Sequence, residues 1–163
     1  MNCRISNDLK KLLPNFSVIA YEIDFESDFD AMNKSKEVDE YLEKLYTLVS
    51  SKYNYDEITK IPKLKQTRDG YKKMGKDPSH TRPACEALLR RVIKGNSLYR
   101  LGDVIDLGNI LSIETLRSVC VVDKERLVND IQALIDKGLH EDLRYVNRVN
   151  YELSIIIKMG FAN

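Results

Sequence analysis

The sequence is poor in the residues that bind metals and form disulfides. Its 163 residues include two histidines and three cysteines, Cys3, Cys85 and Cys120, and no two cysteines have the C-x-x-C spacing. An odd number of cysteines without that spacing argues against a disulfide framework, and a zinc site would have to gather ligands that are far apart in the sequence. We therefore expect neither a metal nor another cofactor.

Long apolar runs and well-known catalytic motifs are also missing. No apolar run approaches the roughly 18 residues of a membrane-spanning helix, and the first residues have no apolar core typical of a secretory signal. The G-x-S-x-G, P-loop and H-E-x-x-H motifs are absent. With 43% hydrophobic and 31% charged residues, the composition is that of a soluble globular protein. We expect a cytoplasmic protein with one domain, residues 1–163, and no membrane partner; composition does not indicate an oligomeric state.

Charge is distributed unevenly along the chain. Residues 21–57 contain eleven acidic and four basic side chains, a net charge of −7, whereas residues 60–94 contain eleven basic and three acidic ones, a net charge of +8. A basic segment of this kind favours binding to a phosphate backbone, because each neutralised phosphate releases counterions. The alternative is that the basic segment packs on the acidic one or is simply solvated.

Hydrophobic periodicity predicts a strand followed by helices. Residues 17–25 alternate and are rich in β-forming side chains, which indicates a strand. Residues 35–50 carry an apolar stripe of helical period, with Ser35 suited to the helix start. The lysine-rich residues after Pro62 are expected to form a connection, with a short helical turn at residues 68–74 that stops at Gly75.

A further helix is expected directly after Pro83. Its apolar positions Cys85, Leu88, Leu89 and Val92 are predicted to be buried, and Gly95 follows them. Arg82, Glu86 and Arg90 share a flank at four-residue spacing, which fits either a ladder of ion pairs or a ridge that faces phosphates.

The remaining segments give mixed signals. Periodicity alone leaves residues 104–114 open between a buried helix and a strand, and residues 118–122 are typical of a strand. Residues 127–135 have the pattern of an amphipathic helix, and residues 151–157 alternate as a strand does.

The order of polar residues between positions 67 and 123 is distinctive. Along it lie Arg68, Tyr71, Lys72, Gly75, Asp77-Pro78-Ser79, Arg82-Pro83, Glu86-Ala87-Leu88, Arg90-Arg91, Asp106, Asn109, Ser112 and Asp123. This order resembles the B3/B4 domain, which is the tRNA-binding and editing module in the β subunit of bacterial phenylalanyl-tRNA synthetase and also occurs as small stand-alone proteins. The stand-alone kind is the closer match, and roughly a third of the chain is covered well.

The resemblance implies a fold, a partner and a site. The expected fold is a single α+β domain with a mixed sheet core and packed helices, with a short helix that begins near Asp106. The expected partner is tRNA. Candidates for RNA binding are Arg68, Lys72, Lys73, Arg82, Arg90 and Arg91, and candidates for a pocket that holds a mischarged aminoacyl end are Asp106, Asn109, Ser112 and Cys120. For Asp106, a helix cap is the favoured interpretation.

The chain departs from the family pattern in two places. Cys120 stands where the synthetase motif has a histidine, which removes an obvious general base, and we expect Cys120 to be a buried strand cysteine rather than a nucleophile. The usual C-terminal segment, which closes the pocket, is also expected to be missing, so that either the domain is truncated or residues 127–163 rebuild this wall of the pocket differently. The possible functions are thus a tRNA-binding module that hydrolyses mischarged aminoacyl-tRNA, a non-catalytic module that binds RNA or protein, and a pocket for a small molecule.

Overall fold

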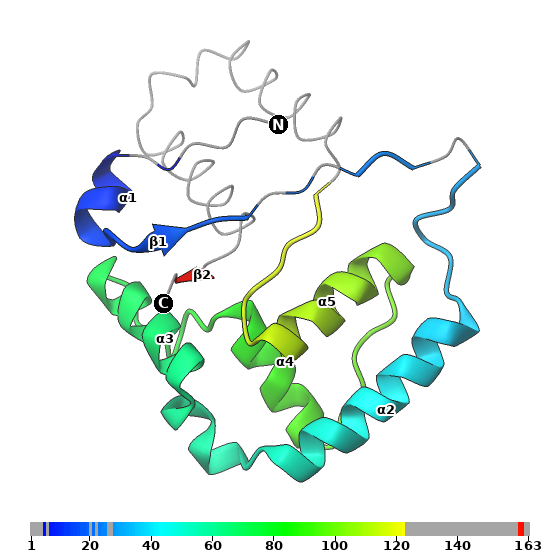
Figure 1. Ribbon diagram of the computed structural model, residues 1–163. Helices are drawn as coiled ribbons and strands as arrows, with labels where there is room; N and C mark the ends of the chain where they lie inside the picture. Colours follow the sequence, from blue (N-terminus) through cyan, green and yellow to red (C-terminus); the bar gives the residue numbers. More distant parts are fainter. Residues whose placement is uncertain are drawn as a thin grey trace.

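The computed structural model describes residues 5, 7–19, 21, 23–25, 28–122 and 160–161 (Figure 1). Helices dominate this part of the chain. The elements are α1 (Asn7–Leu12), β1 (Phe16–Ser17), α2 (Lys36–Lys52), the 3-10 helix η1 (Tyr55–Lys60), α3 (Pro62–Lys73), α4 (Ala84–Ile93), α5 (Asp103–Thr115) and β2 (Gly160–Phe161).

The two helices with the clearest apolar stripes form as predicted. In α2, the Oγ atom of Ser35 accepts a hydrogen bond from the backbone N–H of Val38, and acidic residues follow in the first turn. In α4, Pro83 precedes the first helical residue, and Gly95 follows the helix with a φ of +78°, a conformation that glycine adopts without steric cost. Local signals alone were therefore enough to place both helices.

α3 is longer than the sequence pattern suggested. The expected connection after Pro62 is instead the start of a 12-residue helix, in which Pro62 occupies the first turn. Proline is tolerated there because the first N–H groups of a helix have no intrahelical acceptor. The helix ends before Gly75, at the predicted stop.

α5 settles the choice that periodicity left open for residues 104–114. The segment is a helix, and it begins at Asp103, three residues before the expected start near Asp106. Gly102 precedes it with a φ of +136°, and a Cβ atom at this position would lie 2.6 Å from the backbone oxygen of Ala31. Only glycine fits this close approach of two loops.

The predicted α+β fold with a mixed sheet core is wrong. The described residues are mostly helical, and their strand pairing consists of β1 against β2, antiparallel, with Phe16 opposite Phe161. Of the strand expected over residues 17–25, only Ser17 lies in β1, and residues 118–122 form no strand. The predicted helix at 127–135 and the predicted strand at 151–157 lie outside the described residues.

The failure of this strand has a physical cause. Alternation gives a segment one apolar face, but a strand also needs a neighbouring strand to pair with its backbone N–H and C=O groups. Ile19, Tyr21 and Ile23 are 61, 81 and 67% exposed, so their apolar face is not packed within the described structure.

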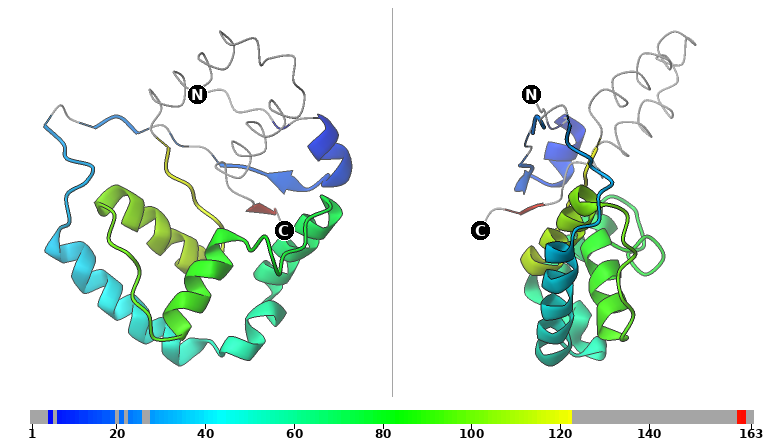
Figure 2. Two further views of the ribbon diagram at one scale, coloured as in Figure 1. Left: turned by 180° about the vertical axis from the view of Figure 1, so that it is seen from behind. Right: turned by 90° about the vertical axis from the view of Figure 1, so that its right-hand side faces the viewer.

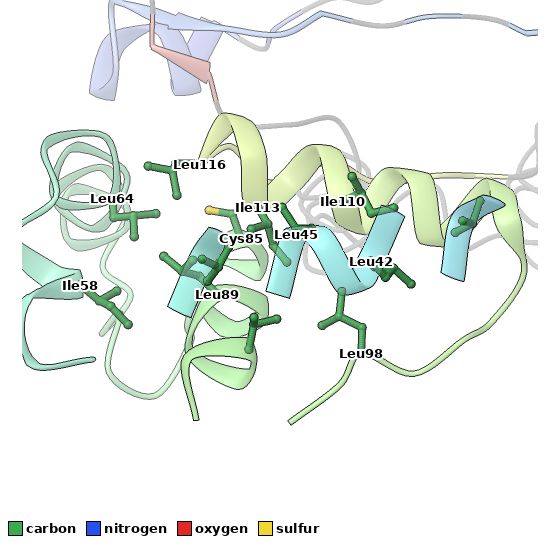
Figure 3. Packing of buried hydrophobic residues seen from close by; sticks show 13 residues of the cluster. Leu42, Leu45, Ile58, Leu64, Cys85, Leu89, Leu98, Ile110, Ile113 and Leu116 are labelled. Atoms are coloured by element: carbon green, nitrogen blue, oxygen red, sulfur yellow. The ribbon is translucent and has the colours of Figure 1, made fainter. Parts of the chain in front are cut away.

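The main hydrophobic core lies between α2, α4 and α5, which pack against one another, with η1 and α3 alongside (Figures 1 and 2). Figure 3 shows side chains from all five elements meeting there. The buried members are Val38, Leu42, Leu45, Val49, Ile58, Leu64, Cys85, Leu89, Val92, Leu98, Ile110, Ile113 and Leu116. Leu88 packs against this cluster, as predicted, but its side chain is only partly buried and not fully buried.

A second, smaller cluster joins the N-terminal elements to α3. It consists of Leu13, Phe16 and the ring of Tyr71. Residues near the start of the described chain are thereby held against the buried side of α3. The opposite, charged side of α3 remains at the surface, and the candidate site lies there.

Candidate nucleic-acid interface

The exposed side of α3 carries a stripe of positive charge. Lys65, Arg68 and Lys72 are three and four residues apart, so they lie on one face of the helix. This face borders a hollow of about 410 Å³ next to η1. The hollow is lined by Thr59, Lys60, Lys65, Arg68, Asp69 and Lys72. Four cationic side chains therefore meet one carboxylate.

The ion pairs at the rim leave these lysines available to a ligand. Lys72 Nζ lies 3.8 Å from Asp69 Oδ1, and Lys60 Nζ lies 3.3 Å from Glu57 Oε1. All four side chains are more than half exposed, and exposed pairs of this kind contribute at most about 1 kcal/mol. A phosphate that approached the hollow would compete with weak partners.

A second hollow adjoins the first and shares Lys60 with it. Its volume is about 290 Å³, and its lining residues are Lys52, Tyr53, Asn54, Glu57, Lys60 and Ile61. The two hollows together extend from the end of α2, past η1, to the last turn of α3.

Three of the predicted RNA-binding arginines converge on one buried carboxylate. The side chain of Glu86 on α4 is fully buried. Arg68 Nη1 donates to both of its oxygens at 3.1 Å, and Arg90 Nε donates to Oε1 at 2.8 Å. Arg82 Nε lies farther away, at 3.8 Å. The ladder of ion pairs, one of the two alternatives for this flank, is thus formed, and it is charged +2 overall because three arginines face one glutamate.

Arg68 links this ion-pair cluster to the large hollow. Its guanidinium also donates to the backbone oxygen of Pro78 at 3.1 Å, and its side chain is 18% exposed. Because Glu86 and Pro78 hold one end of the guanidinium in place, the orientation of Arg68 at the wall of the hollow is fixed before any ligand binds.

The remaining predicted cations lie elsewhere. Arg91 Nε donates to the backbone oxygen of Ser97 at 2.7 Å, and its guanidinium stacks 4.1 Å from the centroid of the Tyr99 ring. Lys73 is exposed in the last turn of α3 and lines neither hollow.

Tyr55 in η1 is flanked by two cations. The guanidinium of Arg90 and the ammonium of Lys94 lie 4.9 and 4.8 Å from the ring centroid. The pKa of the phenol is lowered, first by the hydrogen bond from Lys94 and then by that from Arg90. Arg90 is thus engaged on both sides, by the Glu86 carboxylate and by this ring.

Asp106, a predicted pocket residue, has a structural role. Its buried carboxylate accepts hydrogen bonds from Arg100 Nε at 2.7 Å, from the backbone N–H of Leu101 at 3.1 Å and from that of Gly102 at 3.3 Å. Arg100 also pairs with Asp103 and Asp39. The carboxylate thereby stabilises the loop at the start of α5, but the residue at the N-cap is Gly102 and not Asp106, the predicted cap.

The other pocket candidates line neither of the two hollows. Ser112 is fully buried, where its Oγ atom donates to the Gly108 oxygen at 2.8 Å and accepts from the Val119 N–H at 2.9 Å. Asn109 is partly buried, whereas Cys120 is exposed and not the buried strand cysteine that we expected. Desolvation nevertheless raises the pKa of its thiol, which disfavours the nucleophilic thiolate. Neither hollow is lined by any of these side chains, and Asp123 lies outside the described residues.

Of the lysines that line the hollows, Lys72 was predicted individually, whereas Lys52, Lys60 and Lys65 were not. Lys60 and Lys65 belong to the basic segment of residues 60–94 and so contributed to its charge, but nothing distinguished them from their neighbours. If residues 62–73 had been predicted as one helix, their spacing would have placed Lys65 on the same face as Arg68 and Lys72. Lys52 and Tyr53 had no such signal, because they come from the end of another helix.

The chain matches no protein-family model, no curated protein and no solved structure. Among the described residues, no helix has both the length and the apolar composition needed to cross a membrane. The function must therefore be argued from the two hollows, the charge around them and the B3/B4-like order of residues.

Proposed function

We propose that this protein binds tRNA, and that the basic groove along η1 and α3 holds the RNA backbone. The groove comprises the two adjoining hollows. A cytoplasmic location, where tRNA is abundant, belongs to this proposal.

The observation that carries the proposal is the composition of the larger hollow. The lining of this hollow of about 410 Å³ contains four cations, Lys60, Lys65, Arg68 and Lys72, and one carboxylate, that of Asp69. Lys60 and Arg68 also pair with Glu57 and Glu86, which do not line it. Phosphate is the ligand that this arrangement suits, because ammonium groups act as point charges toward phosphate oxygens and a guanidinium offers a fixed fork of donors. Release of condensed counterions supplies most of the affinity when such a groove binds a nucleic-acid backbone.

The resemblance to the B3/B4 domain favours tRNA over other polyanions. Arg68 and Lys72 belong to the residues that carry the resemblance, and both line the hollow. The fold expected from the family is not found, so the resemblance supports the choice of partner through these positions and not through the architecture.

Binding without hydrolysis is the function that the described residues support. Ester hydrolysis would require donors placed around an oxyanion and a site that excludes water. Asp106 and Ser112 are instead occupied by hydrogen bonds within the fold. We therefore leave deacylation out of the proposal.

The salt dependence of tRNA binding tests the proposal. The double variant Lys65→Ala/Lys72→Ala removes two cations from the large hollow, and the slope of log K against log salt concentration should become shallower by roughly one to two units. The matched control is Lys36→Ala/Lys44→Ala, which makes the same change of charge at exposed positions of α2. The control should keep most of the parent's slope.

Two results would contradict the proposal. One is an equal effect of both double variants, which would mean that only net charge matters. The other is the absence of salt-dependent binding in the parent protein, which would instead favour the alternative of a small-molecule pocket.

A further inference from the structure

We infer that the smaller hollow is a nucleobase site, in which a base from a single-stranded segment of the bound RNA stacks on Tyr53. This inference rests on the proposed function, because the strand that supplies the base is the one whose phosphates lie along α3. It adds a distinct contact, a base stacked on an aromatic ring, that phosphate binding alone does not require.

Tyr53 is held in a fixed position at the end of α2. Its backbone N–H donates to the Val49 oxygen at 3.0 Å, which caps the helix. Its ring is partly buried and packs against the main hydrophobic core. A ring that is fixed in this way loses little conformational freedom when a ligand stacks on it.

Tyr53 lines the hollow together with Lys52, which lies over the tyrosine ring. The exposed side chain of Lys52 places its ammonium 5.3 Å from the ring centroid, so a solvated group reaches a face of the ring. An aromatic ring favours a cation there because of its negative face, and it equally suits a stacked base. Lys52 is flexible enough to move from the ring to a phosphate next to the stacked base.

Polar groups around the ring match the edge of a base. The side-chain oxygen of Asn54 accepts the Asp56 N–H at 3.0 Å, which fixes the amide, so that its NH₂ group can donate to a ligand. The carboxylate of Glu57 lines the same hollow and accepts hydrogen bonds. Ile61 adds apolar surface. The volume of about 290 Å³ is close to the lower end of small-molecule sites.

The position of Lys60 connects base and backbone. Lys60 lines both hollows, so the two hollows meet at this residue. An RNA strand whose base lies beside Tyr53 therefore has its adjacent phosphates directed toward the cations of the larger hollow, Lys65, Arg68 and Lys72. A base in a duplex is stacked between its neighbours and cannot reach such a ring, so the occupant is a loop or an end of the tRNA.

Binding to intact and abasic RNA tests the inference. The full chain is titrated with a single-stranded oligoribonucleotide and with a ribose-phosphate oligomer of equal length and charge that lacks bases. Stacking on one aromatic side chain should make the intact strand bind roughly 5- to 100-fold more tightly. In the Tyr53→Leu variant this ratio should fall to near one, whereas Tyr53→Phe should keep it.

The control variant is Tyr99→Leu, because Tyr99 is 70% exposed and lies outside both hollows. It should leave the ratio unchanged. If Tyr53→Leu does not fold, equal binding of the two strands by the parent protein would still overturn the inference.

Each outcome distinguishes the two proposals. Equal, salt-dependent binding of intact and abasic strands would overturn the base site and leave backbone binding in place. Discrimination that persists in Tyr53→Leu would also overturn it. Failure of both strands to bind would overturn the base site, and failure of tRNA to bind as well would overturn both proposals.

Discussion

The most informative single perturbation of this fold is Glu86→Gln. Glutamine keeps the shape of the side chain but removes its charge and replaces one acceptor oxygen with an NH₂ donor. Arg68 and Arg90, which now donate to the carboxylate at 3.1 and 2.8 Å, would then face a neutral group, and one of them would face another donor.

The expected cost follows from the burial of these groups. The Glu86 side chain is fully buried, whereas those of Arg68 and Arg90 are 18 and 14% exposed. Removal of one partner from a buried ion pair costs about 3–5 kcal/mol, because the remaining charge is left uncompensated. The arginines can regain some hydration through their exposed parts, so we expect the lower end of this range, about 3 kcal/mol. Arg82 adds little, since its Nε is 3.8 Å away and its side chain is 42% exposed.

Chemical and thermal unfolding followed by circular dichroism would measure this cost. For a chain of this size, about 3 kcal/mol corresponds to a decrease of the melting temperature by roughly 6–12 °C. The control is Glu40→Gln, at an exposed position of α2, which should change the free energy of unfolding by less than about 0.5 kcal/mol. If Glu86→Gln proved as stable as this control, the carboxylate would not be the centre of a buried ion-pair cluster.

Three further predictions concern stability. Leu89→Ala should cost about 2–5 kcal/mol because Leu89 is fully buried, and Leu88→Ala should cost clearly less; equal losses in urea denaturation would mean that α4 is rotated. Gly102→Ala should lower the melting temperature more than Gly75→Ala, because a Cβ atom at Gly102 meets the Ala31–Met32 backbone, whereas at Gly75 it meets no atom within 4 Å; a smaller loss at Gly102 would refute the close approach. Hydrogen bonds from the Ser79 hydroxyl and N–H, and then from His80, hold the pKa of Asp77 well below its usual range. Because the pKa of this carboxyl is lower in the folded protein, its ionised form stabilises the fold above the unfolded pKa of about 3.9. The free energy of unfolding lost in Asp77→Asn, measured by unfolding at a series of pH values, should therefore be constant from pH 7 to 5 and shrink below pH 4. A constant loss down to pH 2 would contradict this.

Part of the candidate site could be predicted from the sequence. The charge count located the basic segment, and the B3/B4-like order of residues singled out Arg68 and Lys72, both of which line the large hollow. The same reasoning could not separate the exposed Lys72 from Arg68 and Arg90, because a positive charge has the same appearance in sequence whether it faces solvent or the buried carboxylate of Glu86. Burial of Glu86 depends on how α3 and α4 pack, and this packing determines which arginines remain available to a ligand.

The sequence by itself determined α2 and α4. A helix closes its backbone hydrogen bonds within four residues, so the capping Ser35, the apolar stripes and Gly95 contain nearly all the information that these helices need. Residues 17–25 had an equally clear alternating pattern, but a strand requires a partner from elsewhere in the chain, and of the described residues in this segment only Ser17 is paired, with Gly160. The shape of the groove was likewise decided by tertiary structure, because Lys52, Lys60 and Lys72 belong to α2, η1 and α3, and the angles between these elements are set by their packing.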